Sequence, residues 1–344
     1  MDHEKRIVFV LGAGASVHAG IPVLQNFLLR TFTILETETL APGTTGLGGH
    51  PSDFSDFRNV LDCWMKWSRK TWNIEDFFQY VDDQDTKEMK KLRVELIWTM
   101  FRTMQLSEEQ FRHRKIGAFG YSYHTIEIYE KFAAQIKQMI QDNIQVQIVT
   151  LNQDILLDQA LMRIDIRPEY HLEKVHPSND PIGTIPINFL KIHGSVNWRV
   201  YVNNPPTTDT VEVHWDAGPG NWHTGKPQER HEKTYLLVPP SNKGREAPPL
   251  KPIRAKAEKA IQEASDLVFL GIGFPPSDDV LAREFSKWAS EGPRKTLHVW
   301  NPDRKVEDTY KKFFTKNVEF PPHPGKPQGT LEYFVLEEKY KDLR

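Results

Sequence analysis

Short runs of almost uninterrupted apolar residues recur along this chain of 344 residues, and they limit its fold more than any other feature. A strand with one face in water alternates apolar and polar residues, whereas a strand covered on both faces is apolar nearly throughout. The runs therefore indicate strands of a parallel sheet between two covering layers. They occupy residues 7–11, 146–151, 187–192, 235–238, 267–272, 296–300 and 331–336.

Helical patterns lie between these runs. Apolar residues recur at spacings of three and four over residues 126–140 and 253–264, before the second and the fifth predicted strand. Alternation of strands and helices is typical of α/β proteins. We therefore predict a Rossmann-like, doubly wound α/β fold with a mainly parallel sheet and an inserted helical subdomain.

Two stretches interrupt the alternation within what we expect to be a single domain, residues 1–344. Residues 24–142 separate the first two strands and show further helical patterns, so we predict a helical insertion there, suited to a lid or a contact surface. The alternative is that its tryptophans only fill its own core; they are Trp64, Trp67, Trp72 and Trp98. Residues 199–233 are rich in proline and glycine, which predicts an irregular or hairpin excursion.

The charge balance and the cysteine count exclude several classes of function. Lys and Arg total 44 against 46 Asp and Glu, a net charge of -2, so we expect no direct nucleic-acid binding. Cys63 is the only cysteine, which excludes an intrachain disulfide and a zinc site built on several cysteines of this chain. The 13 histidines form no H-E-x-x-H motif, so we expect no zinc. No apolar run is long enough to cross a membrane, and the composition suits the cytoplasm.

Glycine-rich turns follow two of the predicted strands. One comprises Gly12, Ala13, Gly14 and Ser16, and the other contains Gly271 and Gly273. Glycines after a strand let the backbone approach a phosphate, and a dinucleotide is the natural ligand of such a turn. The alternative is a tight turn without a ligand. Because the spacing is not G-x-G-x-x-G, it does not favour a hydride-transferring dehydrogenase.

Polar residues follow three strands at the edge where α/β sheets hold ligands. Asn152 and Asp154 follow the second strand, although the position of Asp154 taken alone favours an N-cap of a helix at 155–163. His193 follows the third and is placed for acid–base chemistry, the alternative being a structural histidine. Asn301 or Asp303 follows the strand at 296–300 and could hold a ribose hydroxyl, unless both serve only the turn.

In this order, the motifs resemble the catalytic core of sirtuins, and more closely a bacterial sirtuin-like branch associated with antiphage defence. The motifs are G-A-G-A-S (12–16) with G-I-P (20–22), N-x-D (152–154), K-x-H-G-S-x-N-W (191–198), V-P-P (238–240) and G-x-x-F-P-P-x-D (271–278). The resemblance extends from residue 6 to about residue 303, and the insertion at 24–142 matches no motif of that family.

The resemblance implies that NAD is the substrate and that its nicotinamide–ribose bond is cleaved. It implies that Asn152 positions the attacking water or ribose, that Asp154 holds the carboxamide of nicotinamide, and that His193 is the general base. It also implies which residues bind the rest of the nucleotide. The phosphates would be surrounded by Gly12, Ala13, Gly14 and Ser16, with Gly271 and Gly273 opposite them, and the adenosine ribose would face Asn301.

The chain departs from protein-deacylating sirtuins in ways that favour hydrolysis. Those enzymes carry a four-cysteine zinc module, whereas this chain has one cysteine, and V-L-Q (23–25) stands where they have D-F-R. We therefore expect an NAD glycohydrolase that yields nicotinamide and ADP-ribose and depletes NAD in antiphage defence. The alternative is a non-hydrolytic module that senses NAD or ADP-ribose. Because a toxic NAD hydrolase has to be restrained, we expect a homo-oligomer or a partner protein, which would be a HerA-type ATPase or an Argonaute-type protein.

Overall fold

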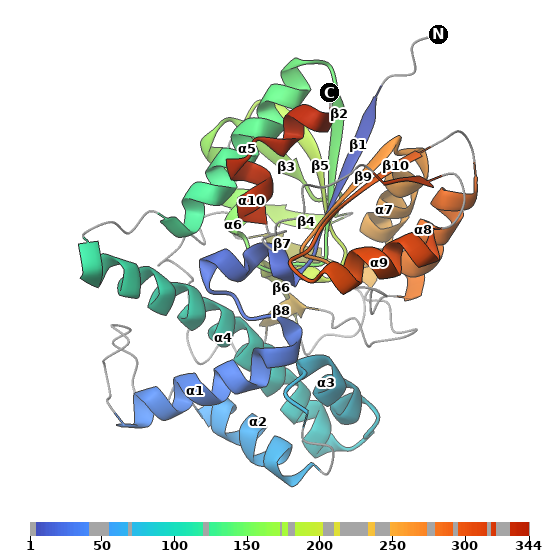
Figure 1. The fold of residues 1–344 in the computed structure, drawn as a ribbon. Coiled ribbons are helices and arrows are strands. Elements are labelled where there is room, and N and C mark those ends of the chain that lie inside the picture. Colours follow the sequence, from blue (N-terminus) through green and yellow to red (C-terminus); the bar gives the residue numbers. More distant parts are fainter. Residues whose placement is uncertain are drawn as a thin grey trace.

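A seven-stranded parallel sheet forms the centre of the computed structural model (Figure 1). Its strand order is β11-β10-β9-β1-β2-β5-β3, and each neighbouring pair is parallel. The strands are β1 (Arg6–Leu11), β2 (Gln145–Thr150), β3 (Ile166–Glu169), β5 (Ile185–Lys191), β9 (Asp266–Leu270), β10 (Lys295–Trp300) and β11 (Val318–Glu319). The predicted Rossmann-like α/β fold is thus confirmed.

The structure describes most of the chain, in thirteen segments. They are residues 5–40, 55–67, 71–119, 124–172, 174–177, 183–201, 210–213, 233–237, 248–273, 279–291, 295–314, 318–320 and 331–343. The V-P-P motif (238–240) and the end of the second glycine turn (274–278) lie outside these segments. Among the described helices, none combines the length and the apolarity needed to span a bilayer.

Helices cover both faces of the sheet (Figure 1). One face carries α5 (His124–Gln141), α6 (Leu156–Arg163) and α10 (Leu331–Leu336), and the other carries α7 (Lys251–Glu263), α8 (Asp279–Ser290) and α9 (Arg304–Phe313). On the first face, the ring of Phe9 in β1 lies 5.2 Å from that of Phe132 in α5. On the second, the ring of Phe269 in β9 lies 4.8 Å from that of Phe285 in α8. Aromatic side chains therefore fill both interfaces between sheet and helices.

The prediction of a strand at residues 331–336 is wrong, because this segment forms helix α10. Leu331, Phe334 and Val335 are its buried residues, and their spacing of three and four places them on one side of a helix. Phe334 packs edge-on against both Phe9 and Phe132, so α10 completes the covering layer on that face. The run is short and rich in aromatic residues, which made it look like a strand.

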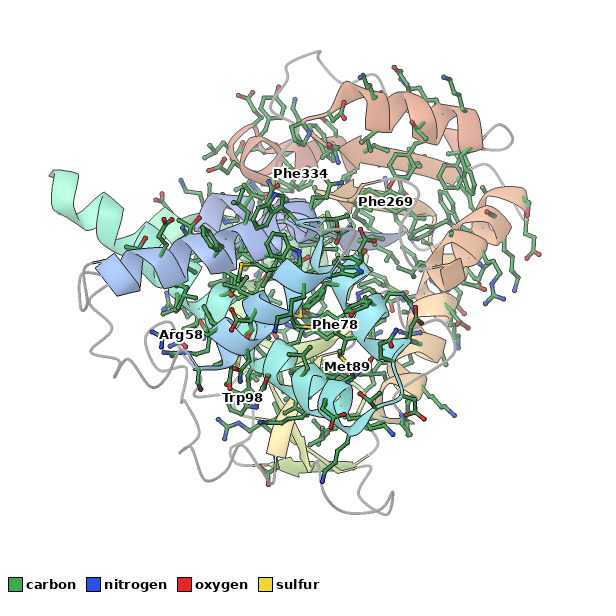
Figure 2. The ribbon with its side chains drawn as sticks, turned by 90° about the horizontal axis from the view of Figure 1, so that it is seen from below. Arg58, Phe78, Met89, Trp98, Phe269 and Phe334 are labelled. Atoms are coloured by element: carbon green, nitrogen blue, oxygen red, sulfur yellow. The ribbon has the colours of Figure 1, made fainter. Side chains whose placement is uncertain are left out.

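Four helices from the predicted insertion pack together below the sheet. They are α1 (Phe27–Leu40), α2 (Ser55–Lys66), α3 (Ile74–Asp82) and α4 (Lys87–Phe119). Trp64, Trp67 and Trp98 are buried among them, so these tryptophans fill the core of the helical unit. Figure 2 shows Phe78 and Trp98 within this unit, apart from Phe269 and Phe334 at the sheet. Helix α5 also lies within the 24–142 stretch, but it covers the sheet.

A second, four-stranded sheet stands beside the first and was not predicted. Its order is β4-β7-β6-β8, with β6 antiparallel to both β7 and β8. The strands are β4 (Lys174–Pro177), β6 (Gly194–Tyr201), β7 (Thr210–Val213) and β8 (Lys233–Leu237). The strand predicted at 235–238 belongs to this sheet and not to the parallel one. Of the 199–233 excursion, the described residues are the end of β6, strand β7 and the first residue of β8.

Candidate active site

A cavity of about 580 Å³ lies at the carboxyl ends of the parallel strands. From β1 the chain continues to β2 on one side, and it later returns to β9 on the other side of β1. Such a reversal of strand order is where open α/β sheets bind ligands. Every residue proposed above for the site lines this cavity: Gly12, Ala13, Gly14, Ser16, Asn152, Asp154, His193, Gly271, Gly273 and Asn301.

The two glycine turns pack directly against each other. The N–H of Gly12 donates to the carbonyl of Leu270, and the N–H of Gly14 donates to the carbonyl of Gly271, each at 3.0 Å. A Cβ on Gly14 would lie 2.8 Å from the Cα and the oxygen of Gly271, which is too close for any side chain. These glycines are therefore needed to join the turns. A Cβ on Gly273, in contrast, would meet no atom within 4 Å.

The hydroxyl of Ser16 joins the polar side chains of the cavity into one network. Ser16 lies at the end of the β1 turn, in the 3-10 helix η1 (Ala13–Ala19), and is buried. Its Oγ donates to Oδ2 of Asp154 at 2.7 Å and accepts from Nδ2 of Asn152 at 3.0 Å. A hydroxyl has one proton, so the 2.8 Å bond between Ser16 and Tyr129 is donated by Tyr129. Ser16 thus holds the two side chains that follow β2.

Tyr129 is a member of this network that the sequence analysis did not single out. It lies on the apolar stripe of α5, and on that basis it counts as a core residue. Burial, and next the negative charge of Asp154, raise the pKa of Tyr129 well above its usual value, so its hydroxyl stays protonated and donates. A buried tyrosine usually has a partner for its hydroxyl, and this is the signal that could have found it.

Asp154 lies at the start of α6 and lines the cavity, although the N-cap position of α6 is taken by Ile155 and not by Asp154 as predicted. Its Oδ1 accepts from the N–H of Leu156 at 3.2 Å, which stabilises the first turn of α6. Its Oδ2 accepts from the hydroxyl of Ser16. The helix and the network together fix the orientation of this carboxylate, which is almost completely buried.

His193 occupies the connection between β5 and β6. Gly194 follows it with a φ of 81°, a left-handed conformation that lets the chain turn sharply into β6. His193 lines the cavity and is buried, and its backbone carbonyl accepts from Nε2 of Gln153 at 3.4 Å. The loops that follow β2 and β5 are thereby tied together beside the cavity.

The side chain of Asn301 ties two strand ends together. Its Nδ2 donates to the carbonyl of Ile272 at 2.8 Å, and its Oδ1 accepts from the N–H of Asp303 at 2.9 Å. Asp303 also lines the cavity, and its Oδ1 accepts from the N–H of Lys305 as the N-cap of α9. Asn301 therefore shapes this end of the cavity, while the exposed Asp303 offers its carboxylate there.

The helical unit supplies an apolar wall opposite the strand ends. Phe27, Phe78, Met100 and Met104, from α1, α3 and α4, line this side. Among the described residues that line the cavity, Glu75, Asp154 and Asp303 are acidic and none is a lysine or an arginine. Few ordered polar groups within an apolar pocket are typical of a small-molecule site.

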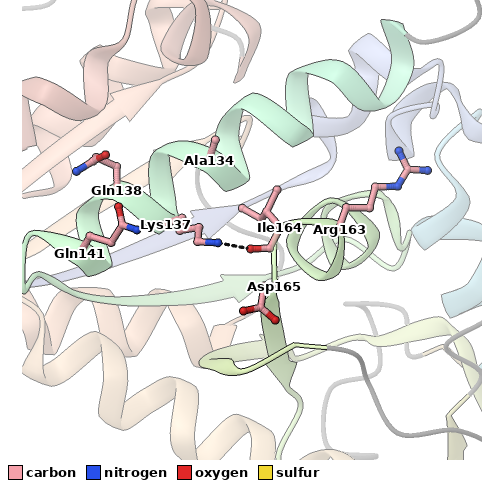
Figure 3. Close-up of a pocket in the computed structure, with 7 residues that line it drawn as sticks. All are labelled: Ala134, Lys137, Gln138, Gln141, Arg163, Ile164 and Asp165. Carbon is pink, nitrogen blue, oxygen red and sulfur yellow. Dashed lines mark hydrogen bonds between the residues drawn. The ribbon is translucent and has the colours of Figure 1, made fainter.

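A second cavity, of about 470 Å³, lies between α5 and the end of α6 (Figure 3). It contains none of the residues that the sequence analysis proposed. Two of its lining residues bond to each other, because Nζ of Lys137 donates to the carbonyl of Ile164 at 2.7 Å. Among the residues that the structure describes, no group of three or more His, Cys, Asp or Glu side chains is arranged to hold a metal ion.

Comparisons with known proteins find similarity only among solved structures; neither a family model nor a curated protein matches the chain. A Sir2 homologue in complex with NAD is 12% identical, with 99% of this chain and 92% of that chain covered and a TM-score of 0.44. A mutant Sir2 homologue in complex with 2′-O-acetyl ADP-ribose is also 12% identical, with 99% and 94% covered and a TM-score of 0.46. Because each TM-score is below 0.5, the function has to be inferred from this chain's own residues.

Proposed function

We propose that this protein is an NAD glycohydrolase that cleaves NAD to nicotinamide and ADP-ribose. One observation carries the proposal: a single cavity at the switch point of the sheet is lined by both glycine turns and by Asn152, Asp154 and His193. The glycine turns suit a dinucleotide, and the three polar side chains suit cleavage of a glycosidic bond within it.

The reaction breaks the bond between C1′ of the ribose and the nitrogen of nicotinamide. Its electron pair leaves with the nicotinamide, and positive charge develops on the ribose. The oxygen of a water molecule bonds to C1′, and a proton of that water passes to His193. Asn152 orients the water and Asp154 holds the carboxamide of the leaving group. Dipoles that are already oriented before the reaction contribute most in a site shielded from water.

The hydrogen-bond network provides that orientation in advance. Asn152 and Asp154 both bond to the Ser16 hydroxyl, which Tyr129 holds in turn. Neither side chain has to be ordered when the substrate binds, which lowers the entropy cost of reaching the transition state.

The test is product analysis after incubation of the purified protein with NAD. Wild type should release nicotinamide and ADP-ribose. Asn152→Ala and His193→Ala should each lower turnover at least about a hundredfold, the lower range for a positioned proton-transfer group. Binding of NAD, measured by calorimetry, should persist, because the glycine turns are unchanged.

The matched control for His193→Ala is His171→Ala. His171 bonds to Asn188 at 2.6 Å and does not line the cavity, so its loss should leave turnover unchanged. Wild-type turnover in both site variants would refute the proposal. Binding of NAD or ADP-ribose by the wild type without any turnover would instead support the alternative, a sensing module.

We further propose that the protein acts in the cytoplasm as an antiphage effector that depletes NAD. A freely active NAD hydrolase would harm its own cell, so assembly into a homo-oligomer, or binding of a HerA-type ATPase or an Argonaute-type protein, controls it. The helical unit forms one wall of the cavity and exposes Leu29, Phe32 and Met65. Light scattering and NAD assays across a dilution series test this control. A monomer with constant specific activity would refute it.

A further inference from the structure

The segment from Lys191 to Trp198 contains more polar residues than the proposed chemistry uses. The most unusual is Lys191, the last residue of β5, which is among the largest fully buried side chains. Lysine is almost never fully buried unless its charge is paired. Its role therefore has to lie in the contacts that it makes inside the protein.

Lys191 makes two kinds of contact directly behind the cavity. Its Nζ lies 3.2 Å from Oδ2 and 3.3 Å from Oδ1 of Asp158, a residue of α6 that is also buried. It also donates to the backbone carbonyl of Asp154. The hydroxyl of Tyr170 also donates to Oδ1 of Asp158.

Stability alone does not account for this buried pair. The cost of removing two charges from water usually cancels most of their attraction, and apolar residues of similar volume often serve equally well. Burial is also the largest influence on Asp158 and raises its pKa, with Lys191 acting in the opposite direction. What an ion pair adds over apolar packing is a fixed geometry for the groups that it bonds.

The group fixed here is the loop that carries Asn152 and Asp154. Lys191 holds the backbone carbonyl of Asp154, while Ser16 and Leu156 hold its carboxylate. The neighbouring carbonyl of Gln153 accepts from the N–H of Val196 at 2.9 Å. Lys191 and the segment that follows β5 therefore hold the loop that follows β2 through hydrogen bonds to its backbone carbonyls.

We infer that Lys191 and Asp158 are positioning residues that hold the backbone of Asp154, and through it the Asn152–Ser16–Asp154 network, in the geometry needed for cleavage. The inference rests on the proposed function. Lys191 precedes His193 by two residues, so the end of β5 supplies both the proposed general base and the support of the Asp154 backbone.

The decisive variant is the double substitution Lys191→Met with Asp158→Asn. It removes both charges together and leaves no uncompensated ion, so the chain should fold with a melting temperature near that of the wild type. We expect kcat for NAD to fall about ten- to a hundredfold, as for a small displacement of catalytic groups, while the Kd for NAD changes much less. Tyr170→Phe, which removes one hydroxyl, should lower kcat in the same direction by less.

A second measurement does not depend on turnover. Hydrogen exchange of the Leu156 and Val196 amides, which bond to Asp154 and Gln153, should accelerate in the double variant. The matched control is Lys137→Met, because Lys137 also donates to a backbone carbonyl, that of Ile164, but at the second cavity (Figure 3). It should change neither kcat nor the exchange of those two amides.

The outcomes separate the two proposals. A folded double variant with wild-type kcat and wild-type exchange would overturn the positioning role. If the wild type hydrolyses no NAD but the two amides exchange faster in the double variant, the proposed function fails and the positioning role stands. If Lys137→Met lowers kcat as much as the double variant, the effect is one of general stability and the inference is refuted.

Discussion

At the scale of single residues, we expect the charge of the cavity to decide between NAD and NADP. Its described lining has acidic residues and no lysine or arginine, and Asp303 stands at the end of β10. In dinucleotide folds an acidic side chain binds the ribose hydroxyls of NAD, whereas a basic one accommodates the extra phosphate of NADP. We expect Asp303→Asn to reduce the preference for NAD over NADP about tenfold, or about 1.4 kcal/mol.

Calorimetric titration with both nucleotides measures this preference. Asparagine caps helices as well as aspartate does, so the N-terminus of α9 should be preserved. Glu75→Gln is the control, because it removes another acidic residue from the same lining. A tenfold change in that variant too would indicate a general charge effect, and an unchanged ratio in Asp303→Asn would contradict the ribose contact.

The glycines of the two turns should differ sharply in their tolerance of a side chain. Gly14→Ala forces a methyl group against the backbone of Gly271 and should lower the free energy of unfolding by about 1–3 kcal/mol, as overpacking does. Gly273→Ala meets open space and should fold like the wild type. Chemical denaturation compares the two. Equal stability of both variants would show that the turns are not packed as described.

At the scale of elements, the sequence predicted five of the seven strands of the parallel sheet, but it did not predict β3, β11 or the side-chain network. Strands β1, β2, β5, β9 and β10 are apolar runs and were predictable, and the carboxyl ends of parallel strands necessarily meet at one edge. That is why ten residues from five loops could be assigned to one cavity. The run at 331–336 failed because a few apolar residues fit a strand and one side of a helix equally well.

What the sequence could not show is which polar atoms are already occupied by partners within the protein. Ser16 and Tyr129 are separated by 113 positions, and Lys191 and Asp158 by 33. Periodicity places each residue on a face of its own element, but their meeting depends on how α5 and α6 lie on the sheet. The side chain of Asn301 illustrates the same point. Its Nδ2 already bonds to the carbonyl of Ile272 and its Oδ1 to the N–H of Asp303.

Helix α10 should contribute strongly to stability although it is short. Phe334 is fully buried against Phe9 and Phe132, and Gln135 of α5 donates to the carbonyl of Val335 at 2.8 Å. Phe334→Ala should therefore lower the free energy of unfolding by about 3–5 kcal/mol. Leu336→Ala is the control, because Leu336 lies in the same helix and is 58% exposed. Urea denaturation that gives equal losses would contradict the packing of α10 on the sheet.

At the scale of the whole molecule, buried tyrosines make stability sensitive to high pH. Burial is the largest influence on Tyr129, Tyr170 and Tyr310, and it raises the pKa of each above its usual value of about 10. Above that pH the unfolded chain loses these protons while the folded chain keeps them. The unfolded state then binds fewer protons, so the free energy of unfolding falls as the pH rises.

Tyr310 is the best residue for testing this effect, since Tyr129 and Tyr170 belong to the networks around the cavity. It lies in α9, and its ring packs 5.2 Å from that of Phe269 and 6.0 Å from that of Phe314. Tyr310→Phe keeps this packing and removes the ionisable group. From pH 8 to pH 11 the free energy of unfolding of the variant, relative to that of the wild type, should rise by about 1.4 kcal/mol. This is the cost of keeping one phenol protonated one pH unit above its unfolded pKa. Urea denaturation at both pH values measures the two free energies, and subtracting them cancels the titration of lysines common to both proteins. If variant and wild type differ in free energy of unfolding by the same amount at pH 8 and pH 11, the Tyr310 hydroxyl ionises as readily in the folded protein as in the unfolded chain.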